Sequence, residues 1–279
     1  MRLDANELYY QMLELYADHK TEDNLLVICN EGGSRSGKTF DAFAFIVTYC
    51  DHNRNENKQI YVLRDTLTNC RDFTYKDWQN FLTLYQIPHE TKSSGQKPDT
   101  MLFGNMVSFR GLDDEANTEG YPSDGIFLNE ALETKESKVA GLKMRCRSWF
   151  IADWNPKFTQ HWIFNWEGRP NHHFTHSTYK NNKHLEKSVI ATIESYSPWM
   201  LEDLHLPEQE RRPHLANINA GTADRWRWLV YGMGIRSAPE GRIFHNVDFI
   251  DAFPPDVDKI IGIDYGFTSD PTAIVYAAM

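Results

Sequence analysis

Residues 30–40 read NEGGSRSGKTF and directly follow the apolar run 25–29. The phosphate-binding loop pattern G-x-x-x-x-G-K-[ST] begins at Gly32 and is matched at every fixed position through Thr39. Glycine lets the backbone curl so that successive N–H groups point at phosphate oxygens, and a helix that follows adds its positive N-terminal end. A plain glycine-serine turn would not explain a strand before the loop and a helix after it. The stretch therefore predicts a nucleotide-binding P-loop.

The residues of this loop are expected to divide the work of binding a triphosphate. Lys38 reaches the β- and γ-phosphates, and Thr39 supplies a hydroxyl to Mg²⁺. Arg35 is the guanidinium best placed within the subunit to face the charge that develops during phosphoryl transfer. The expected nucleotide-binding set is Gly32, Gly33, Ser34, Arg35, Ser36, Gly37, Lys38 and Thr39.

A candidate catalytic carboxylate follows the strand expected at 125–128, which runs into Asn129 and Glu130. P-loop ATPases carry an acid pair at this place, and Glu130 would polarise the water that attacks the γ-phosphate in line. Asn129 stands where an aspartate usually holds Mg²⁺. Because an amide oxygen offers only a dipole, we expect Asn129 to act on Mg²⁺ indirectly and the metal to be held more weakly.

The sequence Asp153-Trp154-Asn155-Pro156 follows another strand, expected at 149–152. An Asn-Pro pair at the end of a strand can be a simple turn. In a P-loop ATPase, a polar residue at this place senses the γ-phosphate and passes its state to a moving part. Asn155 and Pro156 are therefore assigned to coupling.

Strands alternate with helices along the chain, which predicts an α/β fold with a mainly parallel central sheet. Beyond position 180 the composition changes to a polar, helix-rich stretch, and a proline-rich segment follows it. The expected elements are helices over 4–18, 38–50 and 66–85, a strand over 60–63, a polar loop over 91–100, a hairpin over 101–109 and a strand in the histidine-rich segment HHFTHSTY (172–179).

The net charge of −10 excludes a general nucleic-acid coat that relies on a basic surface. Local cationic runs exist, and charge alone favours a solvated face or internal ion pairing for them. These runs contain Lys143, Arg145, Arg147, Arg225 and Arg227.

The four cysteines show no C-x-x-C spacing, which argues against a zinc site or a disulfide scaffold and for a reducing compartment. No apolar run approaches the roughly 18 residues that a membrane span needs, and the acidic N-terminal stretch is not expected to be a signal peptide. His172, His173 and His176 suggest a metal, but alternation along a strand puts only two of them on one face. A metal site is not favoured there.

The last residues read IIGIDYGF (260–267) and DPTAIVY (270–276), which predicts a strand, an acidic turn and a second strand. This hairpin resembles the opening of an RNase H-like nuclease, in which the aspartate of the first strand is a metal ligand. Two-metal chemistry needs several carboxylates from distant strands, and only fifteen residues follow Asp264. Asp264 is thus expected to belong to an incomplete site, without nuclease activity from this chain alone.

Taken together, the motifs resemble the large terminase subunit of tailed bacteriophages, the motor that pumps DNA into a procapsid. The resemblance runs from about residue 25 to 279 and is specific in its order. The successive motifs are GGSRSGKTF (32–40), YVLRDT (61–66), SFRGLDDE (108–115), GIFLNEA (125–131), LKMRCRS (142–148), DWNP (153–156), HSTYKNN (176–182), YGMGIRSAPEGRIF (231–244) and IGIDYGFTSDPTAIV (261–275).

The resemblance implies a P-loop NTPase domain of the additional-strand, catalytic-glutamate type over 1–236, with a helical lid over about 180–235. A linker over 237–258 and the beginning of an RNase H-like nuclease domain over 259–279 would follow. It implies ATP and Mg²⁺ as cofactors, with a second divalent-metal site only where the full nuclease domain is present.

The partners implied are double-stranded DNA, bound through sequence-neutral phosphate contacts, the phage portal, the small terminase subunit and further copies of the chain in a ring. The implied location is the host cytoplasm, transiently at the portal vertex of the procapsid, with no membrane association.

One mismatch concerns the arginine that reaches a neighbouring subunit's ATP. Many relatives have Arg-Gly about eleven residues before the catalytic glutamate, whereas this chain has Glu119 followed by Gly120. Arg110 and Arg145 are candidate substitutes. Two alternative functions stay open: a nucleotide-dependent assembly or switch module with little hydrolysis, and another P-loop DNA translocase or helicase.

Overall fold

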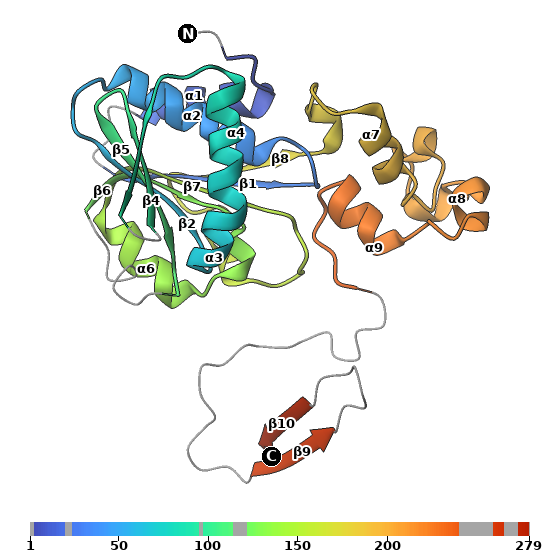
Figure 1. Cartoon of the computed structure of the whole chain (residues 1–279). Helices are drawn as coiled ribbons and strands as arrows, with labels where there is room; N and C mark the ends of the chain where they lie inside the picture. Colours follow the sequence, from blue (N-terminus) through green and yellow to red (C-terminus); the bar gives the residue numbers. More distant parts are fainter. Residues whose placement is uncertain are drawn as a thin grey trace. The chain divides into compact units, whose positions relative to one another are not determined.

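A mostly parallel sheet forms the centre of the first of two compact units, Met1–Pro239 and Glu240–Met279 (Figure 1). The computed structural model describes residues 3–19, 24–94, 97–113, 122–239, 259–264 and 273–278. Within these residues the sheet has eight strands: β1 (Leu26–Gly32), β2 (Gln59–Arg64), β3 (Glu90–Ser94), β4 (Lys97–Leu102), β5 (Asn105–Gly111), β6 (Ser123–Leu128), β7 (Cys146–Trp154) and β8 (His172–Ser177).

The strand order is β3-β4-β5-β2-β6-β7-β1-β8. The six strands from β5 to β8 pair in parallel, and β3 and β4 add an antiparallel edge. Strand β7 lies between β1, which leads into the P-loop, and β6, which leads to Glu130. A strand inserted between these two defines the additional-strand type of P-loop NTPase. The predicted α/β fold with its mainly parallel sheet is confirmed.

Helices cover both faces of the sheet, with α1 (Glu7–His19) and α2 (Lys38–His52) on one side and α6 (Glu136–Arg145) on the other (Figure 1). The predicted helix over 66–85 is α3 (Leu67–Asn69) continued through a π-helical segment, Cys70–Tyr75, into α4 (Lys76–Leu84). Among the described helices, none is both long and apolar enough to cross a bilayer.

The alternation of side chains along β1 separates two cores. Leu26 and Ile28 join the core under α1, α2 and α4, whereas Val27 and Cys29 join the core on the side of α6. Because every second residue of a strand faces the same way, a strand buried on both faces reads as a continuous apolar run. This is why the stretch before the P-loop is apolar throughout.

Trp149 of β7 lies against the backbone of Gly125 on β6. A Cβ atom on Gly125 would lie 2.1 Å from the Trp149 ring, which is fully buried and has Phe45 edge-on at 5.1 Å. We expect Gly125→Ala to lower the free energy of unfolding by about 3 kcal/mol, because the packed ring has no room to move. Urea denaturation measures this change.

The matched control is Gly221→Ala, where φ is +69° and no atom lies within 4 Å of the added methyl. That change should cost only about 1 kcal/mol, from the left-handed backbone. Equal losses in the two variants would contradict the steric explanation.

The polar loop predicted over 91–100 is wrong, since most of it pairs in the antiparallel hairpin of β3 and β4. A strand at the edge of a sheet needs few apolar residues, so its polar sequence is easily taken for a loop. Thr100 on β4 is buried, and its hydroxyl accepts a hydrogen bond from Trp78 Nε1 at 3.1 Å. The hairpin predicted over 101–109 is confirmed as β4 and β5, which meet at Leu102 and Asn105.

The segment 180–235 contains short helices, α7 (Lys187–Glu194), α8 (Leu215–Asn219) and α9 (Arg225–Arg227), and α9 continues into a π-helical segment, Trp228–Gly232. Turns and single-turn 3₁₀ helices join them, and Trp199 and Pro213 form an isolated β-bridge. A small separate core that includes the buried Tyr179, Ile193 and Trp228 holds it together. Arg225 pairs with Glu208 at 2.8 Å and Arg227 with Asp224 at 3.3 Å, so the interpretation of these arginines as ion-pair partners is confirmed.

The second unit contains a hairpin of β9 (Lys259–Asp264) and β10 (Ala273–Ala278), paired antiparallel with Asp264 opposite Ala273. The predicted succession of strand, turn and strand is confirmed for the two strands. Most of the predicted linker, 240–258, lies outside the described residues, as do Glu119 and Gly120.

Candidate functional site

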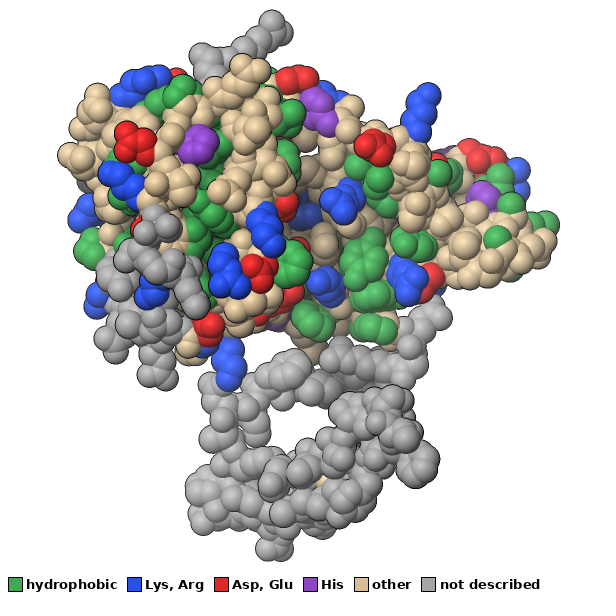
Figure 2. Space-filling view, viewed as in Figure 1, with side chains coloured by type: hydrophobic (Ala, Val, Ile, Leu, Met, Phe, Trp, Pro, Cys, Tyr) green, Lys and Arg blue, Asp and Glu red, His purple; other side chains and the backbone are tan. Residues whose placement is uncertain are grey.

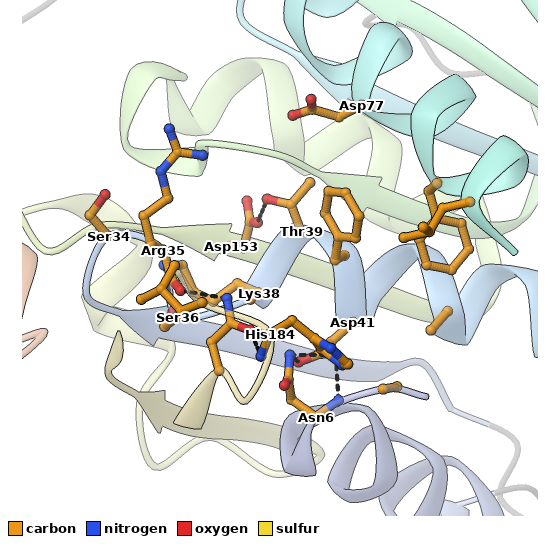
Figure 3. A pocket seen from close by; sticks show the side chains of 18 of the residues that line it. Asn6, Ser34, Arg35, Ser36, Lys38, Thr39, Asp41, Asp77, Asp153 and His184 are labelled. Atoms are coloured by element: carbon orange, nitrogen blue, oxygen red, sulfur yellow. Dashed lines mark hydrogen bonds between the residues drawn. The ribbon is translucent and has the colours of Figure 1, made fainter. Parts of the chain in front are cut away.

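The P-loop connects the end of β1 to the start of α2, and its side chains line a cavity of about 670 Å³ (Figure 3). Two residues of the loop have a left-handed backbone, Arg35 with φ 60° and Gly37 with φ 94°. A Cβ atom on Gly37 would lie 2.5 Å from the side-chain nitrogen of Asn6. Glycine is therefore required at the second fixed position of the motif for both conformation and space.

The outer side of the loop is held by backbone contacts from distant segments. The Gly33 amide donates to the Ser177 carbonyl at the end of β8 (2.9 Å), and the Ser34 amide donates to the Tyr231 carbonyl (2.8 Å). A Cβ atom on Gly33 would lie 2.5 Å from the same Tyr231 oxygen, and one on Gly234 would lie 2.7 Å from the Gly33 nitrogen. The stretch 231–234 thus packs directly on the loop.

Lys38 is buried at the start of α2, with its ammonium group turned into the loop. Its Nζ donates to the carbonyls of Gly32 (3.0 Å) and Gly33 (2.8 Å), to Ser36 Oγ (3.2 Å) and to Asn155 Oδ1 (3.0 Å). Burial lowers the pKa of this ammonium. The structure therefore places Asn155, assigned to coupling from the sequence, in direct contact with the P-loop lysine.

Thr39 contacts a carboxylate that sequence reasoning did not assign to the site. Its hydroxyl donates to Asp153 Oδ2 at 2.8 Å (Figure 3), and Asp153 is only 2% exposed. The second oxygen, Oδ1, accepts from Asn129 Nδ2 and from the Glu130 amide, both at 2.9 Å. Asn129 Oδ1 in turn accepts from the Thr74 hydroxyl at 2.8 Å. One connected network thus joins the P-loop to the ends of β6 and β7.

Glu130 lines the same cavity as Lys38. Its backbone is left-handed, with φ 55° and ψ 53°, a conformation that costs a residue other than glycine about 1–2 kcal/mol. Such strain clusters at functional sites. Burial and then the charge of Asp153 raise the pKa of the Glu130 carboxyl, and Lys157 Nζ lies 4.0 Å from its Oε2.

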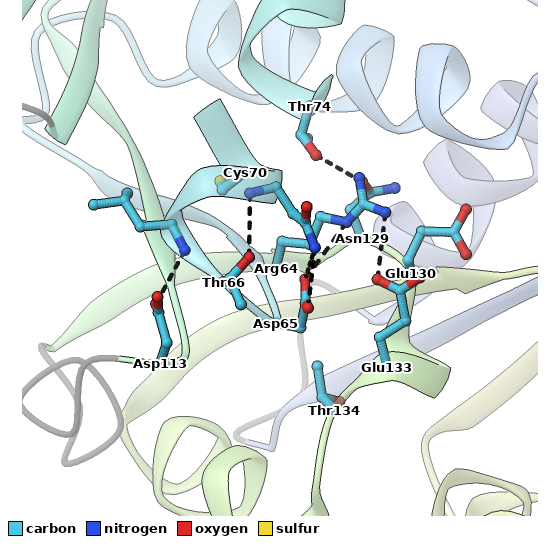
Figure 4. A network of polar contacts seen from close by, with 12 residues as sticks. Arg64, Asp65, Thr66, Cys70, Thr74, Asp113, Asn129, Glu130, Glu133 and Thr134 are labelled. Atoms are coloured by element: carbon cyan, nitrogen blue, oxygen red, sulfur yellow. Dashed lines mark hydrogen bonds and ion pairs between the residues drawn. The ribbon is translucent and has the colours of Figure 1, made fainter. Parts of the chain in front are cut away.

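Three arginines are relevant to the charge at the cavity or between subunits. Arg35 lines the cavity. Arg64, at the end of β2, donates to Glu133 Oε2 at 3.3 Å (Figure 4). Its buried Nε lies 3.8 Å from Asp65 Oδ1 and has no hydrogen-bond partner among the residues that the structure describes. Arg110, one candidate for the missing intersubunit arginine, pairs with Asp99 at 2.7 Å within the same chain.

The cavity extends past the loop to the N-terminal segment. The amide and side chain of Asn6 both donate to the Asp41 carboxylate, at 3.1 to 3.3 Å, and burial raises the pKa of Asp41 to about 6. Beside this pair stands an apolar wall formed by Phe40, Phe81, Leu84 and Tyr85. A phosphate cradle at one end and an apolar wall at the other suit a nucleotide.

The histidines of β8 have other contacts. His176 Nε2 lies 3.0 Å from the Met233 carbonyl oxygen, and His172 Nδ1 lies 2.7 Å from the Pro170 carbonyl oxygen. Across the described part of the chain, no three His, Cys, Asp or Glu side chains are grouped so as to hold a metal ion.

The structure brings most of the residues predicted for the site to one cavity, and four of them, Gly32, Gly33, Asn129 and Pro156, do not line it. Gly32 and Gly33 contact the lysine through their carbonyls, and Asn129 is buried behind Asp153. Pro156 does not line the cavity, but its carbonyl accepts from the Ser237 amide at 3.3 Å. The predicted residues that line the cavity are Ser34, Arg35, Ser36, Gly37, Lys38, Thr39, Glu130 and Asn155.

Residues missed from the sequence include Asp153, Asn6 and Asp41, which line the cavity. Asp153 carried a usable signal, because it ends a buried strand next to the strand that leads to Asn129. Parallel strands end at the same edge of a sheet, so polar residues after adjacent strands meet there.

Residues 25–232 match the phage terminase large subunit family. The large terminase of a thermophilic bacteriophage has a similar structure, with 18% identity, a TM-score of 0.63 and coverage of 98% of this chain and 65% of that one. The same thermophilic phage protein in complex with ADP gives a TM-score of 0.62 at 18% identity, over 99% and 65% of the two chains.

The large terminase of bacteriophage HK97 is similar with a TM-score of 0.52 and 12% identity, over 85% of this chain and 51% of that one. No curated protein sequence matches the chain. The chain spans about 65% of the length of the thermophilic phage terminase. Since the family match covers well over half of its residues, the chain belongs to the phage terminase large subunit family.

Proposed function

We propose that this chain is an ATP-hydrolysing motor subunit of a phage terminase, which moves double-stranded DNA into a procapsid. The observation that carries the proposal is the shared cavity of Lys38 and Glu130 at the ends of parallel strands. A phosphate-binding lysine and a candidate base that face one cavity suit hydrolysis of a bound triphosphate.

In this proposal the triphosphate lies in the P-loop and the base lies against Phe40, Phe81 and Tyr85. Phe40 is 37% exposed, so a base placed on it would bury apolar surface that now faces the cavity. Asn6 and Asp41 would bound the nucleoside end of the site.

Mg²⁺ fits the donor set beside the loop, since Thr39 offers a hydroxyl and Asp153 a carboxylate, both hard oxygen ligands. When bound, the ion would neutralise charge on the β- and γ-phosphates. Lys38 would release the loop carbonyls and turn to the phosphates.

Glu130 would orient the attacking water and accept its proton. The raised pKa of this carboxyl makes it a better base than an ordinary glutamate, while Lys157 and Lys38 favour its charged form. Arg35 would add positive charge from the loop itself.

Coupling to movement would use two routes from the loop to the stretch 231–237, which contains the end of the lid and the start of the linker. Asn155 binds Lys38, and the next carbonyl, that of Pro156, binds the Ser237 amide. The Ser34 amide binds the Tyr231 carbonyl. A movement of the P-loop or of Asn155 when the bound phosphates change would therefore displace both ends of the stretch 231–237.

DNA contact would depend on local cations, because the chain as a whole is acidic. In Figure 2, Lys and Arg side chains are dispersed among acidic and hydrophobic ones on the face in view. Contacts from such Lys and Arg side chains to phosphate oxygens would carry no sequence information. We further propose the portal, the small terminase subunit and a ring of identical chains as partners, and the hairpin of β9 and β10 as the opening of an RNase H-like nuclease domain.

The test is the ATPase rate at increasing protein concentration, with and without double-stranded DNA. We expect the rate per subunit to rise with concentration and with DNA, as sites completed by neighbouring subunits require. Tight ATP binding without turnover under every condition would instead favour the switch module, and separation of DNA strands would favour a helicase.

A further inference from the structure

We propose that Asp153 supplies the carboxylate for the Mg²⁺ of this site, in place of the aspartate that is missing at Asn129. The inference rests on the proposed function, because it concerns the metal that accompanies ATP. It replaces the expectation of weak metal binding. The carboxylate then comes from the end of β7, and the neighbouring strand β6 no longer supplies it.

The register of the sheet makes this displacement possible. Leu128 of β6 pairs with Ala152 of β7, so the next residues on the two strands, Asn129 and Asp153, are neighbours. The Asn129 amide lies within hydrogen-bond distance (2.9 Å) of the Asp153 carboxylate. A carboxylate on either strand therefore serves nearly the same point in space.

The Asp153 carboxylate is aimed at the P-loop. Its Oδ2 accepts the hydrogen bond of the Thr39 hydroxyl at 2.8 Å, and that hydroxyl is the protein's other expected contact to the metal. Asp153 is 2% exposed, so its charge is little screened by water. Two hard oxygen donors thus stand side by side at the start of α2.

Asn129 is the amide that such a carboxylate requires. A carboxylate only accepts hydrogen bonds, so the Asn129 nitrogen must face Asp153 and its oxygen must face a donor, which is the Thr74 hydroxyl. An aspartate at 129 would set two carboxylates within hydrogen-bond distance and disfavour both charges. Asn129 is therefore a positioning residue for Asp153.

A charge swap tests the proposal. Affinity for a fluorescent ADP analogue is measured in EDTA and at increasing Mg²⁺ for wild type, Asp153→Asn, Asn129→Asp and the double variant Asn129→Asp/Asp153→Asn. Asp124→Asn is the matched control, since Asp124 is also buried but lies near the start of β6, at the opposite end of that strand.

In EDTA we expect all five proteins to bind the analogue alike. The Mg²⁺ concentration for half-maximal tightening should rise about 10- to 100-fold in Asp153→Asn and return toward the wild-type value in the double variant. Asn129→Asp should show no tighter response than wild type, and Asp124→Asn should match wild type.

Thermal unfolding without metal separates a structural role from a metal role. An asparagine at 153 can keep its oxygen toward the Asn129 nitrogen and the Glu130 amide and turn its nitrogen to the Thr39 hydroxyl, so Asp153→Asn should melt close to wild type. A wild-type Mg²⁺ response in Asp153→Asn would overturn the proposal. So would a lowered melting temperature that the double variant restores without restoring the Mg²⁺ response. Failure of wild type to bind nucleotide in EDTA and in Mg²⁺ would remove the proposed function itself, and this inference with it.

Discussion

Replacing Lys38 with alanine is expected to lower the affinity for ATP by about 100-fold or more, because a buried ammonium contributes charge-assisted hydrogen bonds to phosphate. The neighbouring hydroxyls of Ser34 and Ser36 carry no charge and cannot replace it. Equilibrium titration with a fluorescent ATP analogue measures the loss.

Lys92→Ala is the control, because Lys92 is exposed on the edge strand β3, far along the sheet order from β1. It should bind as wild type does. In the free protein the Lys38 ammonium also holds the carbonyls of Gly32 and Gly33, so the thermal unfolding of Lys38→Ala must be recorded beside its affinity. A folded Lys38→Ala protein that still binds ATP at wild-type affinity would contradict the P-loop assignment.

Glu130→Gln should keep nucleotide affinity and lose turnover by a factor on the order of 10² to 10⁴, the usual contribution of a general base. Glutamine preserves shape and a hydrogen-bond acceptor but cannot take the proton. The measurement is kcat for phosphate release beside the dissociation constant for ATP.

Glu133→Gln is a close control, because Glu133 is three positions along and binds Arg64 instead of lining the cavity. Its turnover should stay near the wild-type value. Equal hydrolysis by Glu130→Gln and wild type would remove the assignment of Glu130.

The pH dependence of the wild-type rate offers a second check on Glu130. A base must be deprotonated to act, and burial is the largest cause that raises the pKa of this carboxyl. Activity should therefore begin to fall, as the pH is lowered, at a higher pH than an ordinary glutamate would give. A rate that stays constant down to the pH at which an ordinary glutamate becomes protonated would argue against Glu130 as the base.

The local parts of the site could be read from the sequence. The P-loop is a contiguous pattern between a strand and a helix, and Glu130 follows an apolar run directly, so both needed only neighbouring residues. Asp153 could not be assigned in this way. Its role depends on β7 pairing beside β6 and on a register that sets Leu128 opposite Ala152.

Contacts made by the main chain could not be predicted from the sequence either. The contact of Tyr231 with Ser34 joins segments almost two hundred positions apart and involves no side-chain chemistry that a motif would preserve. The polar edge strand β3 was mistaken for a loop because exposure leaves it free of apolar residues. Where the sequence failed, the deciding interaction was either distant along the chain or independent of side-chain identity.

The hydrogen bond between Ser34 and Tyr231 joins two stretches of main chain, so the contact between the P-loop and residues 231–234 does not depend on the side chains at positions 34 and 231. What it cannot tolerate is bulk at positions 33 and 234, where any methyl group would push the two segments apart. Side chains on the surface of the segment 180–235 can therefore change while this main-chain contact stays the same. The close approach of the two segments depends on glycine at both Gly33 and Gly234.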